Sequence, residues 1–250
     1  AYSLSAEIIE KIENTELMLS KLKVKLRGWQ DFGAKYAIVQ KKVLIGDEMG
    51  LGKTIEAIAV MAHLAHGGQN AFIVVCPASI VINWVREIEK HSELKPFLVH
   101  GPSRERAFDQ WQVEGGVAIT TYETIQRLKH ENLDTIDLLV VDEAHYVKNP
   151  DAKRSQTIYS LTERSNNVLY LTGTPLENRL AEMVNLVGKL QPDITKEMEN
   201  SVQYIGSNTF KEKIAPVYLR RNKEDVLTEL PELTQVEEWL SFGCLLYTSD

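Results

Sequence analysis

The sequence has few cysteines, no long apolar run and no excess of positive charge. Only Cys76 and Cys244 occur among 250 residues. Two such distant cysteines give no disulfide framework, so we expect a reducing compartment. No stretch reaches the roughly 20 apolar residues of a membrane-spanning helix, so we expect no membrane partner. The start, AYSLSAEIIEKIENTELM, is acidic and amphipathic and lacks the basic leader and apolar core of a secretory signal.

The net charge of −7 counts against a nucleic-acid binder. It does not exclude one, because local patches matter more than totals. Basic residues do gather in two places, at Lys21, Lys23, Lys25 and Arg27 and again at Arg220, Arg221 and Lys223. Hydrophobic residues make up 44% of the chain, enough for the core of a globular domain. Cys76, inside the run FIVVCP, is predicted to be part of that core.

Short apolar runs alternate with helical patterns along most of the chain. The runs show no polar alternation, which predicts strands buried on both faces, at 43–47, 72–76, 97–100, 117–121, 136–143 and 168–173. Helices are predicted between them at 54–66, 79–91, 104–111 and 152–163, the second of them opened by Ser79. This order indicates an α/β fold with a parallel sheet covered by helices on both faces. Ligands of such sheets bind at the carboxyl ends of the strands, where the motifs below fall.

We expect the strands to stop after residue 175. Helical patterns at 177–190 and, with a break at Pro216, at 207–230 predict a small helical protrusion. The expected division is an N-terminal helical extension at 1–20, an α/β lobe at 21–175, the protrusion at 176–235 and a truncated linker or tail at 236–250. The last eight residues, GCLLYTSD (243–250), fit no element before them. They resemble translated adapter sequence at the end of a gene fragment, and the alternative is a natural strand that opens the next domain.

GDEMGLGKT (46–54) joins a predicted strand to a predicted helix. Its glycines allow the backbone N–H groups to face inward, where a phosphate can bind at the helix N-terminus. We predict that Lys53 reaches the β- and γ-phosphates and that the Thr54 hydroxyl binds Mg²⁺. The strict loop pattern fails at its first position, Asp47, and the alternative is a glycine-rich turn with a solvated lysine. The loop residues expected to contact ATP are Asp47, Glu48, Met49, Gly50, Leu51, Gly52, Lys53 and Thr54.

VVDEAH (140–145) ends the most apolar predicted strand with two adjacent carboxylates. Carboxylates at the tip of a buried strand are costly unless they meet a cation or hydrogen-bond donors. We predict that Asp142 holds Mg²⁺, partly through water, and that Glu143 polarises the attacking water as general base. Together with Lys53 these two form the predicted catalytic set. The alternative is that the acids cap a helix.

DEMGLGKT, DEAH and LTGTPLENR (171–179) together resemble the Swi/Snf type of superfamily-two helicase-like ATPase, over about residues 24–235. The resemblance implies a RecA-like P-loop lobe that uses ATP and Mg²⁺. In LRGWQ (26–30), it gives Gln30 the role of reading adenine. It also implies that His145, Thr172, Gly173 and Thr174 couple the nucleotide state to the grip on DNA.

Three further segments resemble motifs of this family. VVCPASIVINWVREIEKH (74–91) contains a W-x-x-E helix that begins at Trp84, ITTYET (119–124) follows it, and VYLRRNKEDVLTELP (217–231) closes the protrusion. The DNA-backbone contacts that these segments imply are Pro77, Ala78, Ser79, Thr120, Thr121, Tyr122, Arg220 and Arg221. Taken alone, the threonines could cap a strand end and the arginines could form a solvated face.

The resemblance implies a parent protein that hydrolyses ATP and moves along double-stranded DNA without reading its sequence. Such enzymes cleave ATP between two lobes, and the arginines of the second lobe are missing here, so we expect this lobe alone to be inactive. A strand-separating helicase and a non-catalytic, nucleotide-gated DNA clamp remain as alternatives. We expect a bacterial cytoplasm, with the nucleus as the alternative location, and the protein target is not indicated.

Overall fold

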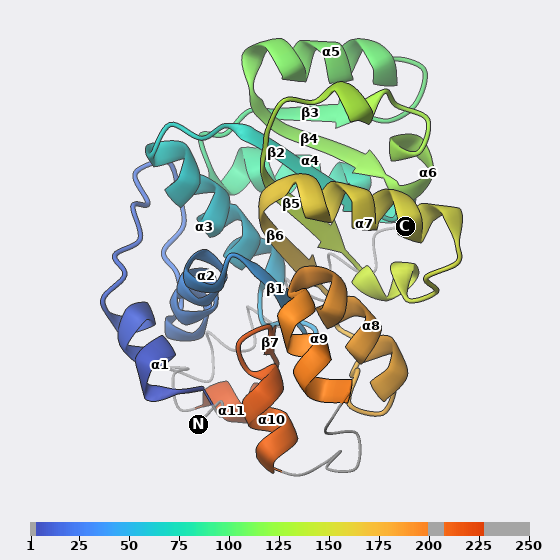
Figure 1. Ribbon diagram of the computed structural model, residues 1–250. Coiled ribbons are helices and arrows are strands. Elements are labelled where there is room, and N and C mark those ends of the chain that lie inside the picture. Colours follow the sequence, from blue (N-terminus) through green and yellow to red (C-terminus); the bar gives the residue numbers. More distant parts are fainter. Residues whose placement is uncertain (1–3, 200–207, 228–250) are drawn as a thin grey trace.

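The computed structural model describes residues 4–199 and 208–227. Within them, a seven-stranded sheet runs in the order β3-β4-β2-β5-β6-β1-β7, and every pair of neighbouring strands is parallel (Figure 1). The predicted parallel sheet is therefore confirmed. The strands are β1 Lys42–Ile45, β2 Ala71–Cys76, β3 Pro96–Val99, β4 Gly116–Thr121, β5 Ile136–Asp142, β6 Ser165–Leu171 and β7 Tyr218–Leu219.

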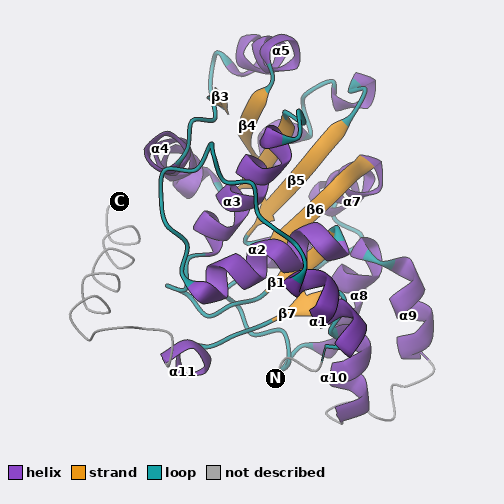
Figure 2. Ribbon diagram, turned by 90° about the vertical axis from the view of Figure 1, so that its left-hand side faces the viewer, coloured by secondary structure: helices purple, strands orange, loops and turns teal. Residues whose placement is uncertain are grey.

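Helices cover both faces of the sheet (Figure 2). One face carries α1 Ala6–Glu13, α2 Gly28–Gln40, α3 Lys53–His66 and α4 Val81–His91. The other carries α5 Arg104–Glu114, α6 Tyr122–Ile125, α7 Lys153–Arg164, α8 Leu180–Leu190 and α10 Asn208–Ile214. The remaining helices are α9 Pro192–Glu199, α11 Lys223–Val226 and the 3₁₀ turns η1 Ala78–Ile80, η2 His130–Asn132 and η3 Ala144–Val147. No helix in the described part of the chain is long and apolar enough to cross a membrane.

The continuous apolar runs are explained by this double coverage. Successive strand residues point to opposite faces, so Leu139 and Val141 enter one core cluster while Leu138 and Val140 enter the other. All four are at most 1% exposed. Burial of one such side chain contributes roughly 1.5–3 kcal/mol, and it favours apolar residues at every position of the strand.

Several predicted boundaries are wrong, among them the starts of α4 and β6. Ser79 does not open α4, because it lies inside η1 and the helix begins two residues later at Val81, after Ile80, whose side chain makes no capping hydrogen bond. β6 begins at Ser165, three residues before the predicted strand. The prediction missed this start because Ser165 and Asn167 are polar and do not continue the apolar run. Both residues are nevertheless buried, and the Asn167 amide donates to the Asp137 carbonyl at 2.9 Å.

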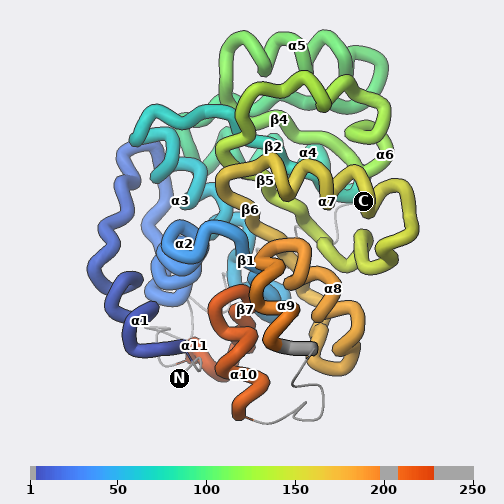
Figure 3. Tube along the Cα trace, viewed as in Figure 1, coloured from blue at the N-terminus to red at the C-terminus, as the bar shows by residue number. Residues whose placement is uncertain are grey.

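The prediction that strands stop after residue 175 is also wrong. After α8, α9 and α10 the chain returns to the sheet and adds β7 beside β1. The amides of Leu44 and Gly46 donate to the carbonyls of Val217 and Leu219 at 2.7 and 2.8 Å. Figure 3 shows the orange-to-red end of the trace running beside the blue β1. A strand of two residues is too short for a periodic pattern, so the sequence alone did not reveal it.

The predicted division of the chain into domains remains a prediction. Cys244, the predicted tail at 236–250 and the possible artefact at 243–250 lie outside the described residues. The end of the segment 217–231 lies outside them as well. Cys76 is fully buried in β2, as predicted.

Candidate active site

Three predicted motifs meet at the carboxyl edge of the sheet. The loop 46–54 follows β1, the two carboxylates follow β5, and LTGTP follows β6. These strands are neighbours in the order β5-β6-β1, and Leu171 aligns with both Asp142 and Ile45. A Cβ placed on Gly173 would lie 3.8 Å from Lys53 Nζ, so the loops after β6 and β1 are close to each other.

The loop after β1 has the backbone that a phosphate cradle requires. Gly50 and Gly52 have φ angles of 93° and 90°, a region that side-chain-bearing residues rarely adopt. α3 begins directly after them at Lys53, whose Nζ donates to the Asp47 carbonyl at 2.7 Å. Burial lowers the Lys53 pKa, and the surrounding carboxylates oppose that shift. The ammonium group therefore lies inside the loop, with an acceptor that an incoming phosphate could replace.

Gln30 lies against the same loop. Its side-chain oxygen accepts from the Arg27 amide at 2.9 Å, and its Nε2 lies 3.4 Å from the Leu51 carbonyl. Trp29 donates to that carbonyl at 2.8 Å. A Cβ on Gly52 would come within 2.3 Å of Gln30 Nε2, so this glycine is also required for the close approach of α2. The structure therefore joins Gln30 to the loop, and its role in reading adenine remains a prediction.

Two of the predicted ATP contacts have side chains that face the protein interior. Asp47 is 0% exposed, and both of its carboxylate oxygens accept from Arg221. Leu51 is 1% exposed and packs with Trp29 and Val226. Their side chains therefore support the loop from the interior, and the predicted contact of these two residues with ATP through their backbone remains a prediction. Their backbone atoms still line it.

Arg221 lies in the interior and not on a DNA-facing surface. It is 0% exposed and donates to Asp47 at 3.0 and 2.6 Å, to Glu56 at 2.5 Å and to the Trp29 carbonyl. The predicted DNA contact is wrong for this residue, because a guanidinium between two buried carboxylates is not available to a phosphate. We call Arg221, Asp47 and Glu56 the ion cluster.

The ion cluster contains two carboxylates and one cation. Burial and the neighbouring Asp47 raise the pKa of Glu56 well above its ordinary value, although Arg221 acts in the opposite direction. The Oε2 atom of Glu56 is buried without a hydrogen-bond partner within the described residues. A Cβ on Gly33 would lie 2.4 Å from Glu56 Oε1, so α2 fits tightly against the cluster.

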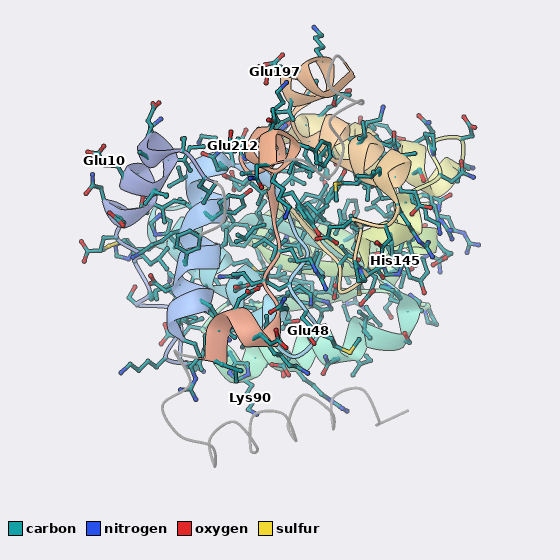
Figure 4. All side chains as sticks on the ribbon, turned by 90° about the horizontal axis from the view of Figure 1, so that it is seen from below. Glu10, Glu48, Lys90, His145, Glu197 and Glu212 are labelled. Atoms are coloured by element: carbon teal, nitrogen blue, oxygen red, sulfur yellow. The ribbon has the colours of Figure 1, made fainter. Side chains whose placement is uncertain are left out.

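The segment around Arg221 also contacts the loop through its backbone. The Glu48 amide donates to the Arg221 carbonyl at 2.8 Å, and the Lys223 amide donates to the Glu48 carboxylate at 2.6 Å. Figure 4 shows Glu48 beside α11. Arg220 is partly buried, donates to the Gly46 carbonyl and lies 3.7 Å from Glu177. Its predicted contact with DNA remains a prediction.

Asp142 and Glu143 form the opposite wall of the site. The Asp142 carboxylate accepts from the indole of Trp84 and from the Glu143 amide, each at 2.8 Å. Burial and the charge of Glu143 raise the Asp142 pKa to about 6, while the Trp84 bond opposes that rise. Burial also raises the Glu143 pKa, and Lys53 lowers it. Glu143 has a φ of 55°, a left-handed conformation that costs about 1–3 kcal/mol in a residue with a side chain and is concentrated at functional sites.

The residues predicted to couple nucleotide and DNA are in contact. His145 Nδ1 lies 3.1 Å from Thr172 Oγ1 and 3.5 Å from Thr174 Oγ1, and the Thr174 amide donates to Thr172 Oγ1 at 3.1 Å. Burial and Lys148 lower the His145 pKa, which favours a neutral ring able to accept a hydrogen bond. His145 Nδ1 also lies 3.5 Å from Glu143. The geometry joins the loops after β5 and β6, and the coupling role remains a prediction.

The predicted DNA contacts divide into two groups. Ala78 and Ser79 are exposed in η1, next to the half-buried Pro77. Thr120, Thr121 and Tyr122 are 1% exposed. The prediction that the side chains of this second group contact DNA is wrong. Thr121 Oγ1 accepts from the Thr124 amide at 3.1 Å and caps α6, which was the alternative interpretation.

The site fits Mg²⁺·ATP in its charges and in its donors. Asp142 and Glu143 are partly buried carboxylates with raised pKa values, and a divalent cation would compensate them. Among residues 4–199 and 208–227, no three side chains gather into a metal cluster of their own. Mg²⁺ usually takes one or two carboxylates together with phosphate oxygens and water, and Asp142 offers one such carboxylate. Asp142 and, as predicted, the Thr54 hydroxyl would be the Mg²⁺ ligands that the protein supplies.

Sequence reasoning missed the partners that shape the site. Glu56 has no motif of its own, although its place one turn after Lys53 on an apolar helix could have indicated a buried charge. Trp84 was noted as the start of a helix and not as a partner of Asp142. The Tyr122 hydroxyl donates to the Asp142 carbonyl at 2.5 Å, a contact that no spacing in the sequence predicts.

Comparison with known proteins agrees with this architecture. The family model described as "SNF2-related domain" matches residues 29–243. The SWI/SNF-related matrix-associated actin-dependent regulator of chromatin subfamily A containing DEAD/H box 1 of Xenopus tropicalis is 32% identical, over 88% of this chain and 25% of that protein. The ISWI chromatin-remodeling complex ATPase ISW1 of Saccharomyces cerevisiae is 34% identical over 75% of this chain and 18% of its own length. The chain thus spans about a quarter or less of these relatives.

Two solved structures share the fold. The Sulfolobus solfataricus SWI2/SNF2 ATPase core in complex with dsDNA matches with a TM-score of 0.73 and 28% identity, over 87% of this chain and 49% of that one. The Sulfolobus solfataricus SWI2/SNF2 ATPase core domain matches with a TM-score of 0.70 and 28% identity, over 86% and 47%. Since the family model spans most of the sequence and the sheet matches an ATPase core of the same kind, this chain belongs to the family of SNF2-related domains.

Proposed function

We propose that this chain is the ATP-binding lobe of an ATPase that moves along double-stranded DNA. The observation that carries the proposal is the meeting of the Lys53 loop, the Asp142–Glu143 pair and the His145–Thr172 contact at one sheet edge. The likeness to an ATPase core solved with double-stranded DNA supports the choice of a duplex. Because the chain covers only part of its relatives, the activity of the whole protein is part of the proposal.

Each wall of the site would have its own task. Lys53 and the amides of its loop would bind the phosphates, with Gln30 near the base. Mg²⁺, held by Asp142 and Thr54, would neutralise phosphate charge when bound. Glu143 would orient the attacking water and accept its proton, and its raised pKa brings it closer to that of an effective base at neutral pH.

DNA contact would run through η1 at one end of the same edge. The exposed backbone and hydroxyl at Ala78 and Ser79 suit a phosphate oxygen. Binding of this kind should not depend on sequence and should weaken steeply as salt rises. A strong preference for one duplex sequence at fixed salt would contradict it.

Two alternatives remain open. A strand-separating helicase would unwind a tailed duplex, and a nucleotide-gated clamp would bind DNA in the full-length protein without hydrolysing ATP. The chromatin regulators among the relatives favour the nuclear location over the bacterial cytoplasm that we expected, and the location stays a prediction.

Nucleotide binding is the direct test of the proposal. Titration of a fluorescent ATP analogue with Mg²⁺ should show binding by the 250-residue chain. Lys53→Ala should weaken it by tenfold or more, which corresponds to about 1.4 kcal/mol. Lys35→Ala, which changes a lysine paired with Asp31 on α2, is the control and should bind as the wild type does. Equal affinities of wild type and Lys53→Ala would refute the proposed phosphate site.

Phosphate release tests whether this lobe needs a second lobe for hydrolysis. We expect almost no hydrolysis by this chain alone, with or without duplex DNA, because the transition-state charge lacks the arginines of a second lobe. A longer protein with that lobe should hydrolyse ATP and respond to duplex DNA, and Glu143→Gln in it should abolish turnover while ATP stays bound. Robust DNA-stimulated turnover by the 250-residue chain would overturn the two-lobe argument.

A further inference from the structure

Two aromatic side chains donate hydrogen bonds to Asp142, one to its carboxylate and one to its backbone carbonyl. The indole Nε1 of Trp84 donates to the Asp142 carboxylate at 2.8 Å. The Tyr122 hydroxyl donates to the Asp142 backbone carbonyl at 2.5 Å and lies 3.3 Å from the carbonyl of Glu143. Both aromatic residues are 1% exposed, so water does not compete for these bonds.

The two aromatics come from the segments that follow β2 and β4, the first and second strands on one side of β5. In the order β4-β2-β5, Trp84 follows β2 through η1, and Tyr122 follows β4 directly. η1 carries the exposed Ala78 and Ser79, where we propose contact with DNA. The segments that follow β2 and β4 are therefore each joined to Asp142 by a buried hydrogen bond.

The backbone between the carboxylates needs such support. Glu143 has a positive φ of 55°, which the chain holds only where surrounding contacts fix it. The Tyr122 ring also stacks on Tyr146 at 5.5 Å between centroids, so it contacts the turn η3 that follows Glu143. Tyr122 thus contacts the chain before the strained residue, at the Asp142 carbonyl, and after it, at the Tyr146 ring.

We propose that Trp84 and Tyr122 are positioning residues. They fix the Asp142–Glu143 pair in the shape that takes Mg²⁺·ATP, and they link that pair to the segments that follow β2 and β4. The inference rests on the proposed function, since it assigns these residues a task within the same site. Both residues act through Asp142, to which their polar atoms donate.

The chain offers matched controls for a purely structural role. Trp111 is 2% exposed and donates from Nε1 to the Gly116 carbonyl at 2.9 Å, beside β4 at the far edge from β1. Tyr36 is 0% exposed and donates to the Ala215 carbonyl at 2.7 Å. Replacement of either by Phe removes the same kind of buried bond and leaves Asp142 untouched.

The decisive measurement is the gain in ATP affinity that Mg²⁺ provides. We would compare Trp84→Phe, Tyr122→Phe, Trp111→Phe and Tyr36→Phe in the 250-residue chain, with a fluorescent ATP analogue in Mg²⁺ and in EDTA. In Trp84→Phe and Tyr122→Phe the gain in ATP affinity from Mg²⁺ should be about tenfold smaller than in wild type, while the affinity in EDTA should be unchanged. Loss of a residue that supports a metal ligand commonly has an effect of this size. The two controls should keep the full gain. An undiminished gain in both Trp84→Phe and Tyr122→Phe would overturn the inference.

Amide hydrogen exchange tests the same idea without a ligand. In Tyr122→Phe the amides of residues 143–147 should exchange at least several-fold faster than in wild type, whereas Tyr36→Phe should leave them unchanged. Tyr122→Phe keeps the ring, so it carries the test even where Trp84→Phe fails to fold. If wild type shows no Mg²⁺-dependent binding, the proposed function fails, and exchange then decides the inference alone. Unchanged exchange in Tyr122→Phe would refute it.

Discussion

The two walls of the candidate site are held by different forces. Beneath the phosphate loop, the ion cluster places Arg221 against Asp47 and Glu56, all 0% exposed. Beneath the carboxylates, Trp84 and Tyr122 offer neutral donors. A buried ion that loses its partner remains as an uncompensated charge, whereas a lost neutral bond costs about one hydrogen bond. The phosphate loop is therefore tied to the stability of the whole fold, and the carboxylate wall can be altered without unfolding it.

Removal of the cation should give the largest effect. Arg221→Met leaves Asp47 and Glu56 without their common partner, and we expect a loss of about 3–5 kcal/mol in the free energy of unfolding. Denaturant titration measures it. Arg220→Met is the control, since Arg220 lies partly exposed beside it and should cost far less. Equal losses in the free energy of unfolding of the two variants would contradict the large cost that we assign to the buried charges of the ion cluster.

The pH dependence of the free energy of unfolding should reveal the raised pKa of Asp142 in the carboxylate wall. The folded pKa of Asp142, about 6, lies above its ordinary value of 3.8, so the folded protein holds the proton more tightly than the unfolded chain does. Protonation of Asp142 therefore stabilises the folded protein at low pH, and this contribution to the free energy of unfolding is lost as pH rises to about 6. Without Mg²⁺, Asp142→Asn should gain about 1–3 kcal/mol relative to wild type between pH 4 and pH 7. A difference that does not change with pH would contradict the raised pKa.

A neutral bond should cost less, and about the same in the carboxylate wall as elsewhere in the core. Tyr122→Phe should lower the free energy of unfolding by about 0.5–1.5 kcal/mol, the ordinary value of a single hydrogen bond. Tyr36→Phe removes a similar bond on the β1 side and should cost a similar amount. Thermal and denaturant melts of both variants measure this. A loss in Tyr122→Phe as large as that of Arg221→Met would remove the contrast between the walls.

An exposed ion pair should matter least. Lys35 and Asp31 lie 2.9 Å apart on α2, with side chains 21% and 40% exposed. Lys35→Gln should change the free energy of unfolding by about 0.5 kcal/mol or less, because water and salt screen the pair. The same melts measure it. A loss comparable to that of Arg221→Met would mean that pairing, and not burial, sets the cost.

Much of the fold was predictable from the order of apolar runs. A run such as LLVV in β5 has no polar face, so it has to be buried on both sides, and with helices between the strands only a covered parallel sheet allows this. That architecture brings the strand ends to one edge, and it therefore predicts that Lys53, Asp142 and Thr172 lie together. The glycines of the loop were equally predictable, because their positive φ angles are a local property of the backbone.

What the sequence by itself determined is thus local: strands, helices, the bend of the loop and the edge at which the motifs lie. The tertiary structure alone decided which residues support them. Arg221 suggests a surface cation, yet it is buried because it follows β7 and meets Asp47, 174 residues earlier, which follows the paired strand β1. Tyr122 and Trp84 read as parts of DNA-contact motifs, yet their polar atoms face Asp142. The environment of a polar side chain depends on segments that the fold brings together, and spacing along the chain carries no record of them.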